Sequence, residues 1–124
     1  ANLALGFVYL HEGDTRNAVD RILQAIGDGE TFSLPVTVRV DPSDAATVAA
    51  MLKLNARSLI FESSERPGLN FSIPISGLDE PITEAGSMII TARTHYHGRS
   101  INPRLQIYAP SIQTLYVLLA EWRK

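Results

Sequence analysis

Hydrophobic residues recur at helical spacing in the first quarter of the chain. Val19, Ile22, Leu23 and Ile26 fall at positions i, i+3, i+4 and i+7, and most of the positions between them are polar. Residues spaced in this way share one face of an α-helix, because the helix completes a turn every ~3.6 residues. The pattern predicts an amphipathic helix over residues 14–26.

The spacing then changes to the period of a strand. From Phe32 to Val40 hydrophobic and polar residues alternate, which predicts a strand with one buried face. Pro35 has no amide hydrogen, so this strand either lies at an edge of the sheet or has one end without a partner. Residues 57–63 and 69–75 are also rich in strand formers, and a Pro-Gly turn signal lies between them. They predict a hairpin.

Further elements complete the predicted order. Residues 42–54 follow an aspartate and begin with proline, which is typical of a helix start, and they predict a second helix. The apolar face of this helix would consist mostly of small residues: Ala45, Val48, Ala49 and Leu52. Residues 88–97 and 104–108 predict two more strands, and a last helix begins at Pro110. That helix has more apolar residues than one buried face requires, so it either packs on two sides or offers a face to a partner.

These elements predict one α+β domain that spans residues 1–124. The expected architecture is a single, mainly antiparallel sheet of five to six strands with about three helices, the last one C-terminal and strongly apolar. With 45% hydrophobic residues in 124, the chain can bury one core and is too apolar for intrinsic disorder. It contains no cysteine, so disulfides and thiolate chemistry are excluded.

The first 27 residues admit two interpretations. Seven residues are spaced as in a tetratricopeptide repeat: Leu5, Gly6, Tyr9, Gly13, Ala18, Ile22 and Ala25. The resemblance implies two closely packed antiparallel helices. However, no second copy follows, and Glu30 stands where the repeat has a proline. Residues 6–10 are rich in strand formers, so the preferred interpretation is a short strand and a turn before the helix over 14–26.

Positive charge is concentrated in the last third of the chain. No acidic residue occurs between Glu84 and Glu121, whereas three arginines and two histidines fall in that interval. Arginine outnumbers lysine by nine to two in the whole chain, and its planar guanidinium suits contact surfaces. If the late strands form one sheet with an uncovered side, that side gathers the candidate binding residues: Arg93, His95, Tyr96, His97, Arg99 and Arg104.

His95 and His97 are also candidates for metal binding. Residues i and i+2 share one face of a strand, so the two imidazoles would stand side by side. Two ligands do not make a site, and no local spacing pairs either histidine with a nucleophile or a carboxylate. A third ligand would have to come from elsewhere, with these candidates: His11, Glu12, Glu62 and Glu84. We therefore predict no metal ion and no cofactor.

The favoured function is a non-catalytic protein-interaction or assembly module, a small subunit or adaptor that uses the arginine-rich sheet face or an edge strand. The motifs of serine hydrolases, phosphate-binding loops, dinucleotide sites and zinc proteases are absent, which makes an enzyme uncertain and less favoured. One alternative is a single-stranded nucleic-acid-binding module that uses Arg93, Tyr96, Arg99 and Arg104. Another is a metal-dependent enzyme that uses His95 and His97.

The expected partner is another protein or a second copy of the chain, with nucleic acid as a further possibility. The first third of the chain is acidic and the last third basic, so the two could match head to tail in a homo-oligomer or neutralise each other within the fold. The apolar stretches are shorter than the ~20 residues that cross a bilayer, so no membrane span is expected. The absence of cysteine and of a signal peptide favours a cytoplasmic location.

Overall fold

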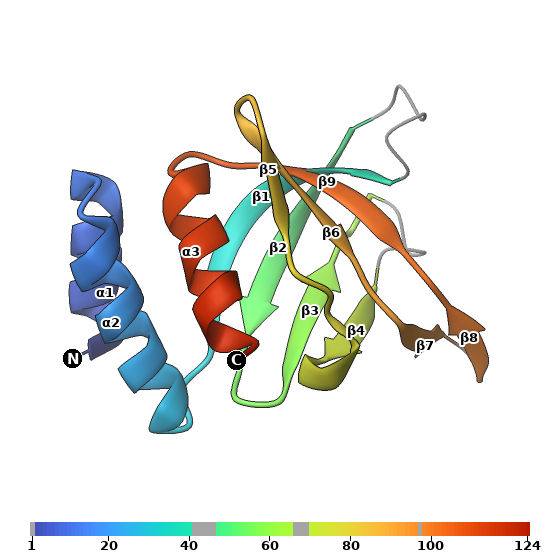
Figure 1. Cartoon of the computed structure of the whole chain (residues 1–124), viewed down its shortest axis with the longest axis horizontal. Helices are drawn as coiled ribbons and strands as arrows, with labels where there is room; N and C mark the ends of the chain where they lie inside the picture. Colours follow the sequence, from blue (N-terminus) through green and yellow to red (C-terminus); the bar gives the residue numbers. More distant parts are fainter. Residues whose placement is uncertain (1, 41–46, 66–69, 97) are drawn as a thin grey trace.

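The computed structural model describes residues 2–40, 47–65, 70–96 and 98–124 (Figure 1). Within them lie the helices α1 (Asn2–Glu12), α2 (Thr15–Gly27) and α3 (Ile112–Trp122) and the short 3₁₀ helix η2 (Ile75–Gly77). The strands are β1 (Phe32–Val40), β2 (Val48–Leu54), β3 (Ser58–Glu62), β4 (Phe71–Pro74), β5 (Ile82–Glu84), β6 (Ser87–Thr91), β7 (Thr94–Tyr96), β8 (Arg99–Ile101) and β9 (Arg104–Tyr108).

The strands are antiparallel and form two sheets. Seven of them lie in the order β4-β3-β2-β1-β9-β6-β5, and β7 pairs with β8 in a small second sheet. The predicted α+β class with three helices is confirmed. The prediction of five to six strands in a single sheet is too small. Residues 48–54, predicted as a helix, form β2, and β5 adds a strand that was not predicted, while β7 and β8 form the second sheet.

The first two helices form a closely packed pair (Figure 1). A Cβ atom on Gly6 would lie only 2.6 Å from Cγ1 of Ile22, so the absence of a side chain at Gly6 permits this approach. The ring of Phe7 stacks on that of Phe32 at the start of β1, with 5.3 Å between centroids. The predicted strand over residues 6–10 is therefore wrong, because packing against α2 and β1 overrides the local strand propensity, and the helical-pair interpretation is correct.

The helix predicted over residues 14–26 is confirmed as α2. Asp14 accepts a hydrogen bond from the backbone N–H of Asn17, with 3.3 Å between N and Oδ1, and so caps the helix. The apolar positions that predicted the helix include Val19, Ile22 and Ile26, which are all buried. The period of 3.6 therefore identified the correct face.

The strand predicted over Phe32–Val40 is confirmed as β1, which lies near the centre of the large sheet. Residues 32–36 pair with β2 alone, and β9 joins on the other side from Thr37 onward. Pro35 thus lies in the half that has one described neighbour. The second of the two predicted options is correct, and a missing N–H is tolerated there because one side of the strand makes no ladder in the described part of the chain.

The helix predicted over residues 42–54 is wrong where the structure describes it. Residues 41–46 lie outside the described part of the chain, and residues 48–54 form β2. Four buried apolar residues alternate along this strand: Val48, Ala50, Leu52 and Leu54. Over seven residues the sequence fits both a helical and a strand period, and pairing with β1 on one side and β3 on the other decides between them.

The hairpin predicted from residues 57–63 and 69–75 is confirmed as β3 and β4. Phe61 and Phe71 are paired across the two strands, and their ring centroids lie 5.8 Å apart. The large sheet curls (Figure 1). Phe61, Phe71 and the apolar residues of β1 and β2 belong to one buried cluster inside this curled sheet. The turn residues 66–69 lie outside the described residues.

The single strand predicted over residues 88–97 is wrong, because it divides into β6 and β7. At the break, the N–H of Arg93 donates to the carbonyl of Gly77 in η2 over 2.7 Å, and Ala92 forms a bridge with Leu78. At the break the backbone of this segment therefore bonds on one side to η2 and the residue after it, while the N–H of Ala92 still donates to the carbonyl of Pro103 over 3.1 Å. The strand predicted over residues 104–108 is confirmed as β9.

Contacts at the same break also hold β7 against β4, the edge strand of the large sheet. Thr94 on β7 donates from Oγ1 to the carbonyl of Ser72 on β4 over 2.5 Å. A Cβ atom on Gly77 would overlap the carbonyl oxygen of Arg93, so only glycine allows this approach. As a result β7 lies beside β4, although the two strands are distant in the sequence (Figure 1).

The last helix packs on two sides, which is the first of the two predicted options. Toward the curled sheet it buries Leu115, Leu118 and Trp122, and the indole Nε1–H of Trp122 donates to the carbonyl of Asn55 over 2.8 Å. On the side that faces α2, the hydroxyl of Thr114 lies within hydrogen-bonding distance of the hydroxyl of Thr15. The helix therefore lies between the helical pair and the sheet (Figure 1). No helix in the described residues is both long and apolar enough to span a membrane.

Candidate functional site

Strands β6 to β9 form one long hairpin. β6 pairs with β9 up to the pair Thr91 and Arg104, and β7 pairs with β8 from the pair Thr94 and Ile101. Three positions separate the two pairs on each arm, so the register does not shift between the sheets. The β7–β8 ribbon is therefore the outer part of the β6–β9 hairpin, and it extends away from the large sheet at the end farthest from α1 (Figure 1).

Inward and outward side chains alternate along this hairpin. Ala92 and Thr94 are buried, whereas Arg93 and His95 between and after them are exposed. On the returning arm Arg104 is exposed. Because residues that share a face of an antiparallel pair lie side by side, these two arginines and the histidine look outward together.

Arg39 of β1 belongs to the same outward face. It is paired with Gln106 of β9, two residues from Arg104. Its guanidinium carbon lies 5.8 Å from the centroid of the Tyr108 ring, and its buried Nε has no hydrogen-bond partner among the residues that the structure describes. We call the outward set Arg39, Arg93, His95 and Arg104 the basic strip.

Arg93 is held in the basic strip by its backbone and by one carboxylate. The hydrogen bond to Gly77 fixes the main chain, and Nη2 lies 3.6 Å from Oδ1 of Asp79. Thr91 donates to the other oxygen of Asp79 over 3.2 Å. The Arg93 side chain remains 68% exposed, so the ion pair leaves the guanidinium available to a ligand.

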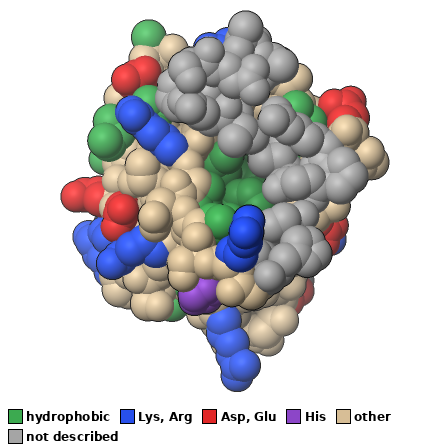
Figure 2. Space-filling model, turned by 90° about the vertical axis from the view of Figure 1, so that its right-hand side faces the viewer, with side chains coloured by type: hydrophobic (Ala, Val, Ile, Leu, Met, Phe, Trp, Pro, Cys, Tyr) green, Lys and Arg blue, Asp and Glu red, His purple; other side chains and the backbone are tan. Residues whose placement is uncertain are grey.

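His95 lies on the rim of an open hollow beside the basic strip. Its Nδ1 is 3.4 Å from Oγ of Ser100, its partner across the ribbon. The hollow, of about 410 Å³, is lined by apolar surface from residues such as Pro74 and Ile101 and by six polar or charged residues: Ser76, Arg93, Thr94, His95, Ser100 and Asn102. Figure 2 views the molecule from the side of this ribbon and shows Lys, Arg and His side chains on that face, with acidic side chains toward its edges.

Not all of the predicted binding residues share this face. Arg99 is exposed, but it pairs with Tyr96 and so lies on the other side of the ribbon from His95. The side chain of Tyr96 and the whole of His97 lie outside the described residues. The binding role of the predicted set remains a prediction.

No metal centre appears in the described part of the chain. No group of three or more His, Cys, Asp or Glu residues there is placed to hold a metal ion. His95 has Ser100 as its neighbour, and the proposed second ligand, His97, is not among the residues described. The metal-dependent enzyme therefore remains an untested alternative.

Sequence reasoning missed Arg39, although one signal was present. Arg39 alternates with Val38 and Val40 and so falls on the polar face of the predicted strand. Its place on the same face as Arg104 depends on the pairing of β1 with β9, two strands more than 60 residues apart in the sequence. Such a pairing cannot be read from local spacing.

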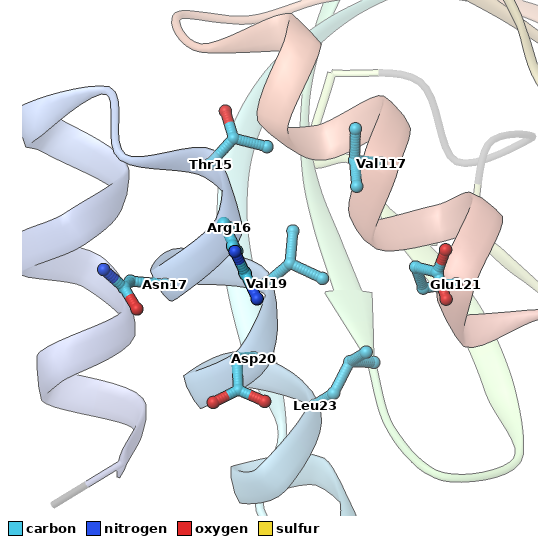
Figure 3. Close-up of a pocket in the computed structure, with 8 residues that line it drawn as sticks. All are labelled: Thr15, Arg16, Asn17, Val19, Asp20, Leu23, Val117 and Glu121. Atoms are coloured by element: carbon cyan, nitrogen blue, oxygen red, sulfur yellow. The ribbon is translucent and has the colours of Figure 1, made fainter.

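A second candidate surface is the groove between α2 and α3. The two helices touch where the hydroxyls of Thr15 and Thr114 lie 2.7 Å apart, and they diverge from that point (Figure 3). The groove has a volume of about 900 Å³. Its wall carries three apolar residues and three charged ones: Val19, Leu23, Val117, Arg16, Asp20 and Glu121. The mixed charge on its rim favours neither an acidic nor a basic ligand.

Comparison with known proteins identifies the fold. No protein-family model and no curated protein matches the chain. Among solved structures, the N-terminal PH domain of human ARAP2 matches with a TM-score of 0.56 at 11% identity, over 77% of this chain and 81% of that one. The C-terminal domain of an unknown protein from Leishmania infantum also matches with a TM-score of 0.56, at 13% identity, over 86% of this chain and 99% of that one.

A third match is to the DH/PH domains of PDZ-RhoGEF, whose crystal structure was determined in complex with RhoA activated by GTPγS. The TM-score is 0.51 at 16% identity, over 73% of this chain and 28% of that one. At such identities the similarity shows the fold alone. The chain therefore has a fold like that of PH domains.

Proposed function

We propose that the protein is a non-catalytic interaction module that binds an acidic segment of a partner protein through the basic strip. The observation that carries this proposal is the outward row of three arginines and one histidine, contributed by three different segments of the chain. Among the described residues only Arg93 of this set has an ion-pair partner, Asp79. The strip is thus positive on a chain whose formal net charge is −2.

The chemistry of the strip suits carboxylates. A guanidinium presents its N–H donors in a planar fork that can bind a carboxylate through two parallel hydrogen bonds. Neighbouring strands lie ~4.8 Å apart, so side chains on successive strands form a row that an extended peptide can follow. Because Arg39 and Arg104 project from paired strands and the backbone of Arg93 is bonded to Gly77, little backbone order has to be acquired on binding.

The fold is compatible with a protein partner. One structure with the same fold, that of the PDZ-RhoGEF DH/PH domains, was determined in a complex with another protein. This similarity supports the class of function and not the choice of surface. The choice of surface rests on the exposed Arg93 and Arg104, with the half-buried Arg39 on the same face.

A titration followed by backbone amide NMR tests the proposal. The probe is a peptide of about ten residues, mostly glutamate, added at about 50 mM salt, where exposed ion pairs are little screened. We expect shifts confined to β1, β9 and the β6–β7 junction. Arg93→Ala and Arg104→Ala should each weaken binding about 2- to 5-fold, the size expected for one exposed ion pair.

Arg57→Ala is the matched control, because Arg57 is exposed at the turn between β2 and β3, away from the strip. It should leave the affinity unchanged. Equal weakening by Arg57→Ala, or shifts spread over the whole surface, would show that the peptide responds only to overall charge and would contradict the proposal.

The same titration with a single-stranded oligothymidylate separates the nucleic-acid alternative. Since phosphate contacts depend steeply on salt, the comparison is repeated at about 150 mM salt. Retained binding of the oligonucleotide with loss of the peptide would favour nucleic acid as the partner and reject the protein ligand. Metal analysis of the purified chain tests the enzyme that would use His95 and His97.

A further inference from the structure

Helix α1 exposes apolar side chains on its outer face. Leu5 is 40% exposed and Val8 is 50% exposed, and residues at i and i+3 are neighbours on a helix surface. In the described part of the chain the only other large hydrophobic residue exposed to this degree is Ile82 on β5, at 59%. Two of the three therefore form one patch on α1.

The patch is free of charge over most of the helix. From Asn2 to Leu10 no residue carries a charge at neutral pH, whereas the outer face of a surface helix is ordinarily polar. α1 packs against α2, and its outer face has no partner within the described residues. Such a face is expected to be covered in solution.

The two ends of this face carry opposite charges. Arg21 of α2 donates from Nη1 to Oδ1 of Asn2 over 3.0 Å, so a guanidinium lies beside the first described turn of α1. Glu12 ends the helix and is exposed. Leu5, Val8 and Glu12 lie at i, i+3 and i+7, so the carboxylate falls on the same stripe as the apolar pair.

This arrangement is complementary to itself. In an antiparallel pair of α1 helices, the apolar pair of one copy meets the apolar pair of the other at the centre. Each Glu12 then approaches the Arg21 of the other copy, at both ends of the pair. A two-fold axis requires a surface that complements itself in this way, and a parallel pair would place like charges together.

We propose that the outer face of α1 binds a second copy of this chain, with the two α1 helices antiparallel. This inference is independent of the basic strip, which lies at the other end of the molecule and stays open in such a dimer (Figure 1). An eleven-residue helix buries less surface than the ~800 Å² per partner of a stable interface. The dimer is therefore weak, with dissociation between about 10 µM and 1 mM.

Sedimentation equilibrium of the 124-residue chain tests the dimer. The mean mass should rise from 13.6 kDa toward twice that value as the concentration increases from about 10 µM to 1 mM. Leu5→Lys should weaken association at least about 10-fold, because it places two like charges at the centre of the interface. Ile82→Lys is the matched control, since it replaces the other exposed hydrophobic residue, and it should leave association unchanged.

A charge exchange tests the antiparallel arrangement. Glu12→Arg and Arg21→Glu should each weaken the dimer about 3- to 10-fold, because each places like charges at both ends of the pair. The double variant restores opposite charges and should return within about 2-fold of the original affinity. Circular dichroism verifies that every variant keeps its helices.

Three results would overturn the proposal. One is a chain that remains monomeric up to about 1 mM. Another is a dimer that survives Leu5→Lys but is lost in Ile82→Lys, which would place the interface on β5. The third is a double variant of Glu12 and Arg21 that associates as poorly as the single variants, which would exclude the antiparallel pair.

Discussion

The helical end of the molecule and the hairpin end are held together in different ways, although each depends on a glycine. At the helical end Gly6 of α1 lies against the side chain of Ile22 in α2. At the hairpin end Gly77 of η2 lies against the backbone carbonyl of Arg93. A side chain can rotate away from an intruding atom, whereas a carbonyl in a hydrogen-bonded segment cannot. The hairpin end is therefore the less tolerant of the two.

The surfaces of the two ends differ as well. The outer face of α1 is apolar and uncharged along most of its length, whereas the outer face of the hairpin carries the basic strip. In the two proposed associations, burial of apolar surface would drive the first and charge would steer the second. The two proposed associations should therefore differ in their response to salt, since screening weakens the charged one more strongly.

The largest effect is expected at the hairpin end. Gly77→Ala forces a Cβ atom into the carbonyl of Arg93 and should lower the free energy of unfolding by about 3 kcal/mol or more, as overpacking against backbone does. Urea denaturation of the purified variant measures this loss in the free energy of unfolding. Gly27→Ala is the control, because no heavy atom lies within 4 Å of a Cβ built there, and it should be neutral or stabilising. A Gly77→Ala variant as stable as the parent would contradict the rigid closure.

The corresponding glycine-to-alanine change at the helical end should lower the free energy of unfolding by a smaller amount. Gly6→Ala meets Cγ1 of Ile22, and a gain of about 1 kcal/mol in helix propensity offsets part of the overpacking, so we expect a net loss of about 1 to 2 kcal/mol. Native-state hydrogen exchange should show the loss of protection mainly in α1. If Gly6→Ala cost as much as Gly77→Ala, the two contacts would not differ in rigidity.

A smaller effect is expected where the helical pair meets α3. Thr114→Val removes the partner of the Thr15 hydroxyl and should cost about 1 kcal/mol, the net value of one hydrogen bond. Thr15→Val and the double variant complete a double-mutant cycle, whose coupling should be about 0.5 to 1.5 kcal/mol. Coupling near zero would show that the two hydroxyls interact no more strongly with each other than with water.

The smallest change in stability is expected within the basic strip. Asp79→Asn removes an exposed ion pair and should alter the free energy of unfolding by less than about 0.5 kcal/mol. It should nevertheless raise the affinity for the glutamate peptide about 2-fold, because Arg93 loses its competing carboxylate. Glu62→Gln makes the same charge change at the exposed pair with Lys53, outside the strip, and should not alter the affinity. Equal gains in both variants would reject the local explanation.

Much of the candidate site was accessible from the sequence. Alternation along a strand already places Arg93 and His95 on one face, and the structure shows both of them exposed. The sequence did not reveal that Asp79 pairs with Arg93 or that Arg39 shares a sheet face with Arg104. These contacts join segments that are distant along the chain, and local patterns carry no information on their approach.

What the sequence determined by itself was the local periodicity of its longer segments and the residues that interrupt them. The helix after Asp14 and the strand from Phe32 each bury one recognisable face, and the apolar last helix packs on two sides, so burial and local preference agree there. Only the tertiary structure decided the short or ambiguous segments. Residues 6–10 became helix because Gly6 fits against Ile22, and residues 48–54 became strand because two neighbours supply their hydrogen bonds.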